Sequence, residues 1–177
     1  MKSNTIRIDN HGKGFKEVIA EGHKVSVYVE MNPEAFRHMQ LLIEEMLSIV
    51  KMADEDLEAS FWIECEDGRY DLHLNTKADL NKEQRYHLLS TSTSGKNEAA
   101  NTFRGVLRDR FEQAMASEVD HDYDELPPEL LADLPIGPVK DPEWDGYERR
   151  ILKKVADSVK IGIQRGVVDV VVSKKYT

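Results

Sequence analysis

The chain has 177 residues, of which 40% are hydrophobic and 32% are charged, and its formal net charge is −9. This composition is typical of one soluble globular domain and excludes a wholly disordered chain. The negative charge opposes nonspecific binding to nucleic acid or to an anionic membrane, since both are polyanions. The sequence has no membrane-spanning apolar run, no signal-peptide pattern and only one cysteine, Cys65. We therefore expect a reduced, cytoplasmic protein without a disulfide.

The first two segments differ in their apolar pattern. Residues 5–31 are predicted to form two strands around a Gly/His/Lys turn, because valines alternate with polar residues at Val25, Val27 and Val29. Residues 32–53 are predicted to form a helix, with Asn32 as its N-cap and Pro33 in the first position. Its apolar residues follow the 3-4-3 spacing of one helix face: Met39, Leu42, Ile43, Met46, Ile49, Val50 and Ala53.

A β-hairpin is predicted next. Residues 57–66 and 70–75 are strand-like, and Asp67-Gly68 between them is a strong two-residue hairpin turn. Three aromatic residues of this hairpin suit either an exposed patch or core packing with cross-strand pairing: Phe61, Trp62 and Tyr70.

The middle of the chain is helical and then irregular. Helices are predicted over 79–89 and 97–117, separated by the polar loop 90–95. Residues 118–143 contain five of the six prolines and many acidic residues, so we expect a long irregular connection. A last helix over 144–156 precedes a hairpin whose turn lies at 164–166. The order of elements predicts an α+β domain with helices collected on one face of a sheet.

The C-terminal pattern resembles a known family. A helix, then Asp157, then a hairpin ending on Lys175 and Tyr176 is similar to the end of serine-kinase anti-sigma factors. These belong to the GHKL, or Bergerat-fold, superfamily of histidine kinase-like ATPases. The resemblance spans about 25–176. It implies a two-layer sandwich with a mixed, mostly antiparallel sheet. The chain 1–177 would be one domain, with 77–143 as a lid-like helical and acidic Pro-rich insertion.

The first family motif falls on the long helix. The family has a Glu, an Asn four residues later and often a Lys-His-Ala; here Glu44, Ser48 and Lys51 occupy matching positions. The resemblance implies that Glu44 is the base and that Ser48 reaches Mg²⁺ only through water. The spacing alone places these residues together on the polar face of the helix, which equally suits a solvated surface.

The other two motifs of the family are incomplete. Asn75 and Thr76 stand where an adenine-binding Asp begins an Asp-x-Gly-x-Gly motif, but neither of its glycines is present. Gly146 is the one remaining glycine of a Gly-x-Gly at the start of the last helix, because Glu148 replaces the other. The glycines of such motifs allow backbone to approach a nucleotide closely, so their loss opposes conventional ATP binding.

Other chemical motifs are weak. Ser94-Gly95-Lys96-Asn97 resembles the end of a phosphate-binding P-loop, but Thr91 stands where the first Gly is required. The six histidines lack metal-ligand spacing.

We therefore expect a regulatory domain with a degenerate ATPase-like fold that binds a protein partner in bacterial-type signalling, as anti-sigma factors do, without catalysis or a cofactor. The alternative is an active ATP- and Mg²⁺-dependent serine kinase or ATPase with Glu44, Ser48, Asn75, Thr76 and Gly146 in its site. The sequence indicates no nucleic-acid or membrane partner and leaves a homodimer open.

Overall fold

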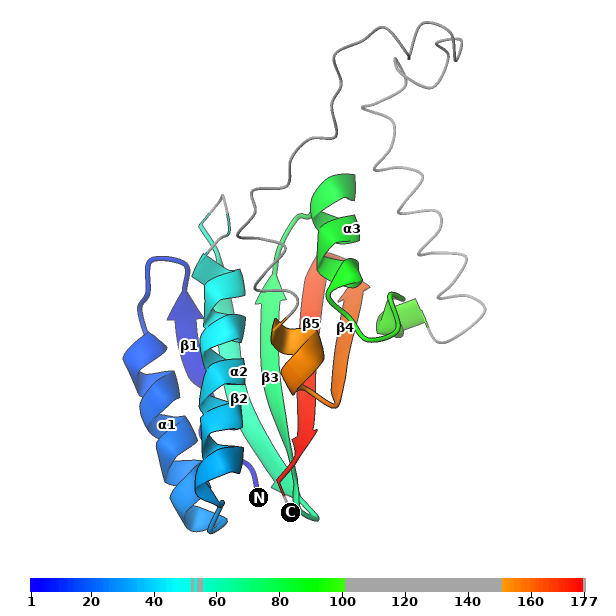
Figure 1. Ribbon diagram of the computed structural model, residues 1–177. Coiled ribbons are helices and arrows are strands. Elements are labelled where there is room, and N and C mark those ends of the chain that lie inside the picture. The colour runs from blue at the N-terminus through cyan, green and yellow to red at the C-terminus, as the bar shows by residue number, and fades with distance from the viewer. Residues whose placement is uncertain (52, 54–55, 101–150, 177) are drawn as a thin grey trace, which may run out of the picture.

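The structure, a computed structural model, describes residues 1–51, 53, 56–100 and 151–176. Its strands form one five-stranded sheet in the order β1-β2-β3-β5-β4, with α1 and α2 packed on one side (Figure 1). The elements are β1 (Ile6–Asp9), α1 (Phe15–Tyr28), α2 (Pro33–Lys51), β2 (Glu58–Glu66), β3 (Arg69–Lys77), α3 (Lys82–Ser90), the 3-10 turn η1 (Glu98–Ala100), β4 (Ser158–Gln164) and β5 (Val167–Lys175). Residues 151–155 are also helical.

The helices and the five-stranded sheet confirm the predicted α+β class. Every pairing between the described strands is antiparallel, so this part of the sheet is not the mixed sheet that the resemblance implied. The histidine kinase-like ATPase fold itself stays a prediction.

The prediction of two strands over 5–31 is wrong for the second strand, because residues 15–28 form α1. The alternating valines suggested a strand, but they do not share one face: Val25 is buried, whereas Val27 is 65% exposed. The buried residues of this segment include Val18, Gly22 and Val25, which follow the helical spacing. Gly22 belongs to this buried face but has no apolar side chain, so the sequence does not show it as part of the pattern. Its backbone packs closely against α2, where a Cβ would lie 2.6 Å from Cδ1 of Ile43.

Helix α2 confirms the predicted long helix. The backbone N–H of Ala35 donates to Oδ1 of Asn32 at 2.8 Å, which is the predicted N-cap bond. The predicted apolar face is also the face that packs on the sheet: Met39, Leu42, Ile43, Met46 and Val50 are all buried there.

Both predicted hairpins are confirmed. The residues of each turn have positive φ: 48° and 73° at Asp67 and Gly68, and 54° and 71° at Arg165 and Gly166. Two residues with φ > 0 define the type I′ turn, whose twist matches that of the flanking strands.

The remaining helices differ from prediction mainly in their bounds. Helix α3 begins three residues later than predicted, at Lys82, because Asn81 forms a capping box with Gln84. Of the helix predicted over 97–117, the described residues 98–100 form η1. Of the helix predicted over 144–156, residues 151–155 are helical and Ala156 is not. The rest of both segments, and all of 118–143, lies outside the described residues.

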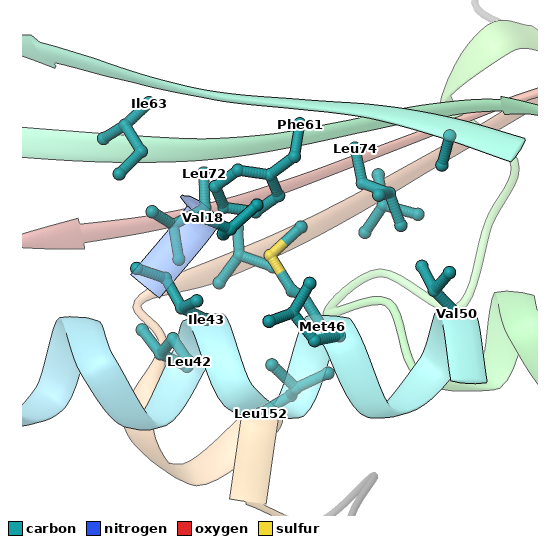
Figure 2. Packing of buried hydrophobic residues seen from close by; sticks show 14 of the residues in the cluster. Val18, Leu42, Ile43, Met46, Val50, Phe61, Ile63, Leu72, Leu74 and Leu152 are labelled. Carbon is teal, nitrogen blue, oxygen red and sulfur yellow. The ribbon is translucent and has the colours of Figure 1, made fainter. Parts of the chain in front are cut away.

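The hydrophobic core lies between the sheet and the helices. Figure 2 shows side chains of the sheet, among them Phe61, Leu72 and Leu74, pointing toward Met46 and Val50 of α2 and toward Leu152. Phe61 and Tyr70 are 1% and 0% exposed, so core packing accounts for these two aromatic residues. Trp62 lies on the opposite face of the sheet, where it pairs with β3.

Candidate functional site

Two of the predicted nucleotide-site residues lie on α2. Glu44 is exposed and accepts a hydrogen bond from Nε2 of Gln40 at 3.1 Å, one turn earlier in the helix. Ser48 is half-buried on the same helix. The carboxylate of Glu44 thus has an ordinary helix-surface partner.

The predicted adenine-contacting residues lie next to each other in β3 but face opposite ways. Thr76 faces the core, and its hydroxyl donates to the backbone carbonyl of Glu58 at 2.7 Å. Asn75 faces away from the helices, and its amide donates to the carboxylate of Asp169 in β5. The sheet therefore separates the side chain of Asn75 from α2. Asn75 does not lie close to Glu44 and Ser48, as a shared nucleotide site would require. Gly146 lies outside the described residues.

The polar loop after α3 uses its hydroxyls within the protein. The hydroxyls of Ser90, Thr91 and Ser92 donate to backbone carbonyls three residues earlier, at 2.6–2.8 Å. The hydroxyl of Thr93 accepts from the backbone of Val159 at 2.7 Å. The donor protons of the Ser90, Thr91 and Ser92 hydroxyls are therefore already used and do not point toward a bound phosphate.

The face of the sheet opposite the helices carries a stacked aromatic pair. Trp62 of β2 is directly opposite His73 of β3 in the register. Their ring centroids are 4.8 Å apart and the planes differ by 4°. The ammonium of Lys2 lies 4.9 Å from the centroid of the Trp62 ring. We call this side of the sheet the open face, because no described helix covers it (Figure 1).

Charged groups surround this pair and hold it in place. The carboxylate of Glu64 accepts from Nε1 of Trp62 at 3.0 Å and lies 2.9 Å from Nζ of Lys2. The hydrogen bond from Lys2, followed by that from Trp62, lowers the pKa of Glu64. Nε2 of His73 lies 3.7 Å from the same carboxylate.

Burial dominates the titration of His73. Desolvation disfavours the imidazolium and lowers its pKa, although Glu64 and Asp71 oppose that effect. Burial alone would raise the pKa of Asp71, but hydrogen bonds from Arg69 and Ser173 reverse this and lower it. These shifts favour a neutral imidazole at His73 and ionised carboxylates at Glu64 and Asp71 at neutral pH.

A second surface lies on the outer side of the helices. A shallow groove of about 290 Å³ runs between α1 and α2. His23 and Phe36 meet edge to face across it, with ring centroids 5.5 Å apart. The groove is largely apolar and holds no cluster of reactive groups; it is lined by Ile19, Gly22, His23, Phe36, Gln40 and Ile43.

Reactive chemistry is poorly represented in the described part of the chain. No group of three or more His, Cys, Asp or Glu side chains is placed there to hold a metal ion. Cys65 is buried, and burial raises the pKa of its thiol, which opposes a role as nucleophile. No described helix is long and apolar enough to cross a membrane. No protein-family model matches the chain.

The Trp62–His73 pair was not predicted from the sequence, yet the sequence contains the signal for it. A two-residue turn at Asp67-Gly68 makes Glu66 the partner of Arg69, and counting back four residues on each strand reaches Trp62 and His73.

Proposed function

We propose that this chain is a non-catalytic regulatory domain that binds a protein partner, as anti-sigma factors do, and that the partner docks on the open face around Trp62. The observation that carries this proposal is the stacked Trp62–His73 pair on the side of the sheet away from α1 and α2. Tryptophan and arginine are the residues that most often dominate protein–protein binding energy. Arg69 lies on the same face, where its guanidinium holds Asp71 with two hydrogen bonds of 2.9 Å.

The charges of the open face favour a protein over a polyanion. Cations and carboxylates alternate there: Lys2 pairs with Glu64, and Arg69 pairs with Asp71. Mixed pairs of this kind suit a polar interface rim, whereas nucleic acid and anionic membranes are bound by a continuous basic patch. The net charge of −9 supports the same choice.

The absence of catalysis and a cytoplasmic location are parts of the same proposal. Asn75 lies on the face of the sheet away from α2, so it does not converge with Glu44 and Ser48. A base, a metal ligand and an adenine contact must surround one ligand to act together. The degenerate ATPase-like scaffold therefore serves here as a surface for a partner.

The docking surface is tested by capture of partners from a lysate with three forms of the protein: wild type, Trp62→Ala and Tyr28→Ala. Tyr28 is the matched control, because it is an aromatic residue 72% exposed on α1, away from the open face. We expect Trp62→Ala to weaken binding of the captured partner at least about tenfold in calorimetry, as removal of a hot-spot residue does. Tyr28→Ala should bind as wild type. Equal binding by Trp62→Ala and wild type would place the contact elsewhere.

The absence of catalysis is tested separately by thermal unfolding with ATP and ADP, each with and without Mg²⁺. A ligand at one hundred times its Kd stabilises the folded state by about 2.7 kcal/mol. We expect no change in Tm at millimolar nucleotide. A concentration-dependent rise in Tm that Glu44→Gln or Asn75→Ala abolishes would instead support the ATP-dependent kinase or ATPase.

A further inference from the structure

The two strands at the ends of the sheet are β1 and β4. Strand β4 pairs with β5 along one edge over its whole length, from Ser158 to Gln164. Along its other edge runs a segment without strand structure, Thr93–Ala99, which we call the strap. It runs parallel to β4, with a single bridge between Asn97 and Ile161.

The strap hydrogen-bonds to the backbone of β4 mainly through its side chains, where a neighbouring strand would use its backbone. The backbone N–H of Thr93 donates to the carbonyl of Val159 at 2.8 Å, and the N–H of Val159 donates back to Oγ1 of Thr93 at 2.7 Å. The side-chain amide of Asn97 likewise donates to the carbonyl of Ile163 and accepts from its N–H, both at 2.8 Å. The hydrogen-bonding groups that β4 turns toward its free edge are thereby satisfied at both of these residues.

The strap is lightly attached compared with the rest of the sheet. Thr93, Ser94, Gly95 and Lys96 are exposed, and only Asn97 of this segment is buried. The hydroxyl of Ser94 bonds within the strap, to Glu98 and to the N–H of Lys96. A segment with few buried apolar contacts and few bonds opens locally at a lower free energy than a paired strand.

We propose that the outer edge of β4 is a strand-addition site that the strap holds closed, and that its occupant is an extended segment of a protein partner. The segment would replace bonds made by the side chains of Thr93 and Asn97 with a main-chain ladder, as peptides do at other sheet edges. Val159, Ile161 and Ile163 of β4 all face the core. The partner segment should therefore have apolar residues at alternate positions, so that they face the core beside these three.

The segment also carries a carboxylate beside Lys160. The side chain of Lys160 lies on the open face, opposite Val171 of β5. Among the described residues Lys160 has no ion-pair partner. Oppositely charged residues on neighbouring strands are a stabilising cross-strand pair, so the position beside Lys160 on an added strand favours an acidic residue.

The proposal is tested with synthetic peptides that read the same in both directions, so that the result does not depend on strand orientation. The probe is acetyl-TVTVEVTVT-amide. Its controls are the same peptide with lysine in place of glutamate, and one with prolines flanking the glutamate, which removes main-chain donors. Binding is measured by fluorescence anisotropy to the full chain.

Four variants divide the contributions. Asn97→Ala and Thr93→Val weaken the strap, and Ser94→Ala is the matched control because its hydroxyl makes no bond to β4. We expect Asn97→Ala to bind the glutamate peptide about tenfold more tightly than wild type, because the apparent affinity rises with the open fraction. Ser94→Ala should bind as wild type. Lys160→Glu should reverse the preference to the lysine peptide, and the proline peptide should not bind.

Amide hydrogen exchange at Val159 and Ile163 measures directly whether the strap opens, because their N–H groups bond to its side chains. Faster exchange in Asn97→Ala and Thr93→Val, without peptide binding, would overturn the strand-addition site. Unchanged exchange in both variants would overturn the role of the strap. This edge is separate from Trp62, so Trp62→Ala should bind the peptide as wild type. The result therefore does not depend on the partner-docking test.

Discussion

The two faces of the sheet are built from the same strands but differ in what they contact. In β3, Leu72 is 0% exposed and packs among the helices, while the next residue, His73, lies on the open face against Trp62. The face toward α1 and α2 contains nearly the whole hydrophobic core, and the open face contains charged pairs and one aromatic stack. The fold therefore depends mainly on one face of the sheet.

The largest effect should come from the core face. Leu72→Ala removes a fully buried side chain and should lower the free energy of unfolding by about 2–5 kcal/mol in chemical denaturation. His73→Ala, one residue away on the other face, should lower it by about 1 kcal/mol, the size of one aromatic pair. Equal losses for the two variants would break the comparison.

The hairpin turns keep the two faces apart, because a shift of register by one residue would exchange them. Gly166→Ala should destabilise the protein by about 1–2 kcal/mol, since a Cβ at φ of +71° is strained. The nearest atom to that Cβ would be the carbonyl oxygen of Ala78 at 3.9 Å, so no steric clash contributes. Gly95→Ala is the control: its φ is also positive, but it lies in the strap and sets no register. Strain alone predicts losses of similar size in both variants, and a larger loss at Gly166 would show an added contribution from its position in the hairpin. An unchanged stability of Gly166→Ala would contradict the role of strain.

The N-cap of α2 anchors the helix that covers the core face. Asn32→Ala should lower the free energy of unfolding by about 1 kcal/mol, because the N–H of Ala35 loses its acceptor. Asn32→Asp, which keeps the acceptor, should remain close to wild type in the same thermal and urea unfolding. An aspartate variant as unstable as the alanine variant would point to a different role for Asn32.

The smallest predicted effect concerns pH at the open face. Burial holds the pKa of His73 below its ordinary value of about 6.5, so the unfolded chain binds this proton more tightly than the folded chain. The stability that neutral His73 contributes is thus present above about pH 6.5 and is lost as the pH falls toward the native pKa. His73→Gln should show a weaker loss of stability over this range.

Fluorescence offers a direct measurement of the same titration. The chain has two tryptophans, so Trp144→Phe leaves Trp62 as the only one. Protonation of the stacked imidazole should quench Trp62 with a midpoint below about pH 6.5. A midpoint above that value would mean that Glu64 and Asp71, and not burial, dominate the pKa.

Local signals in the sequence predicted those elements whose pattern is unambiguous. Asp67-Gly68 and the turn at Gly166 fixed both hairpins, and Asn32 with Pro33 fixed the start of α2. The helix α1 was missed because, over five residues, valines at alternate positions satisfy a strand pattern as well as part of a helical one. Gly22 added to the ambiguity, because it lies on the buried face of α1 against Ile43 but contributes no apolar side chain to the pattern.

The candidate site was less accessible to sequence reasoning for a different reason. The motif spacing of Glu44 and Asn75 carries no information about which face of the sheet each one occupies. The open face emerges only when the register of β2 and β3 is counted through their turn. The strap depends on tertiary contact between Asn97 and Ile163, sixty-six residues apart, which no local pattern encodes.

The pairing of β3 with β5 has a consequence for the rate of folding. Lys77 pairs with Val167, about ninety residues later, so the centre of the sheet forms only after a long loop closes. Closure entropy grows slowly with loop length, by about 0.6 kcal/mol for each doubling. Lengthening the connection between these strands should therefore slow folding only slightly. Substitutions in β3 that favour early pairing should change the refolding rate more than the unfolding rate.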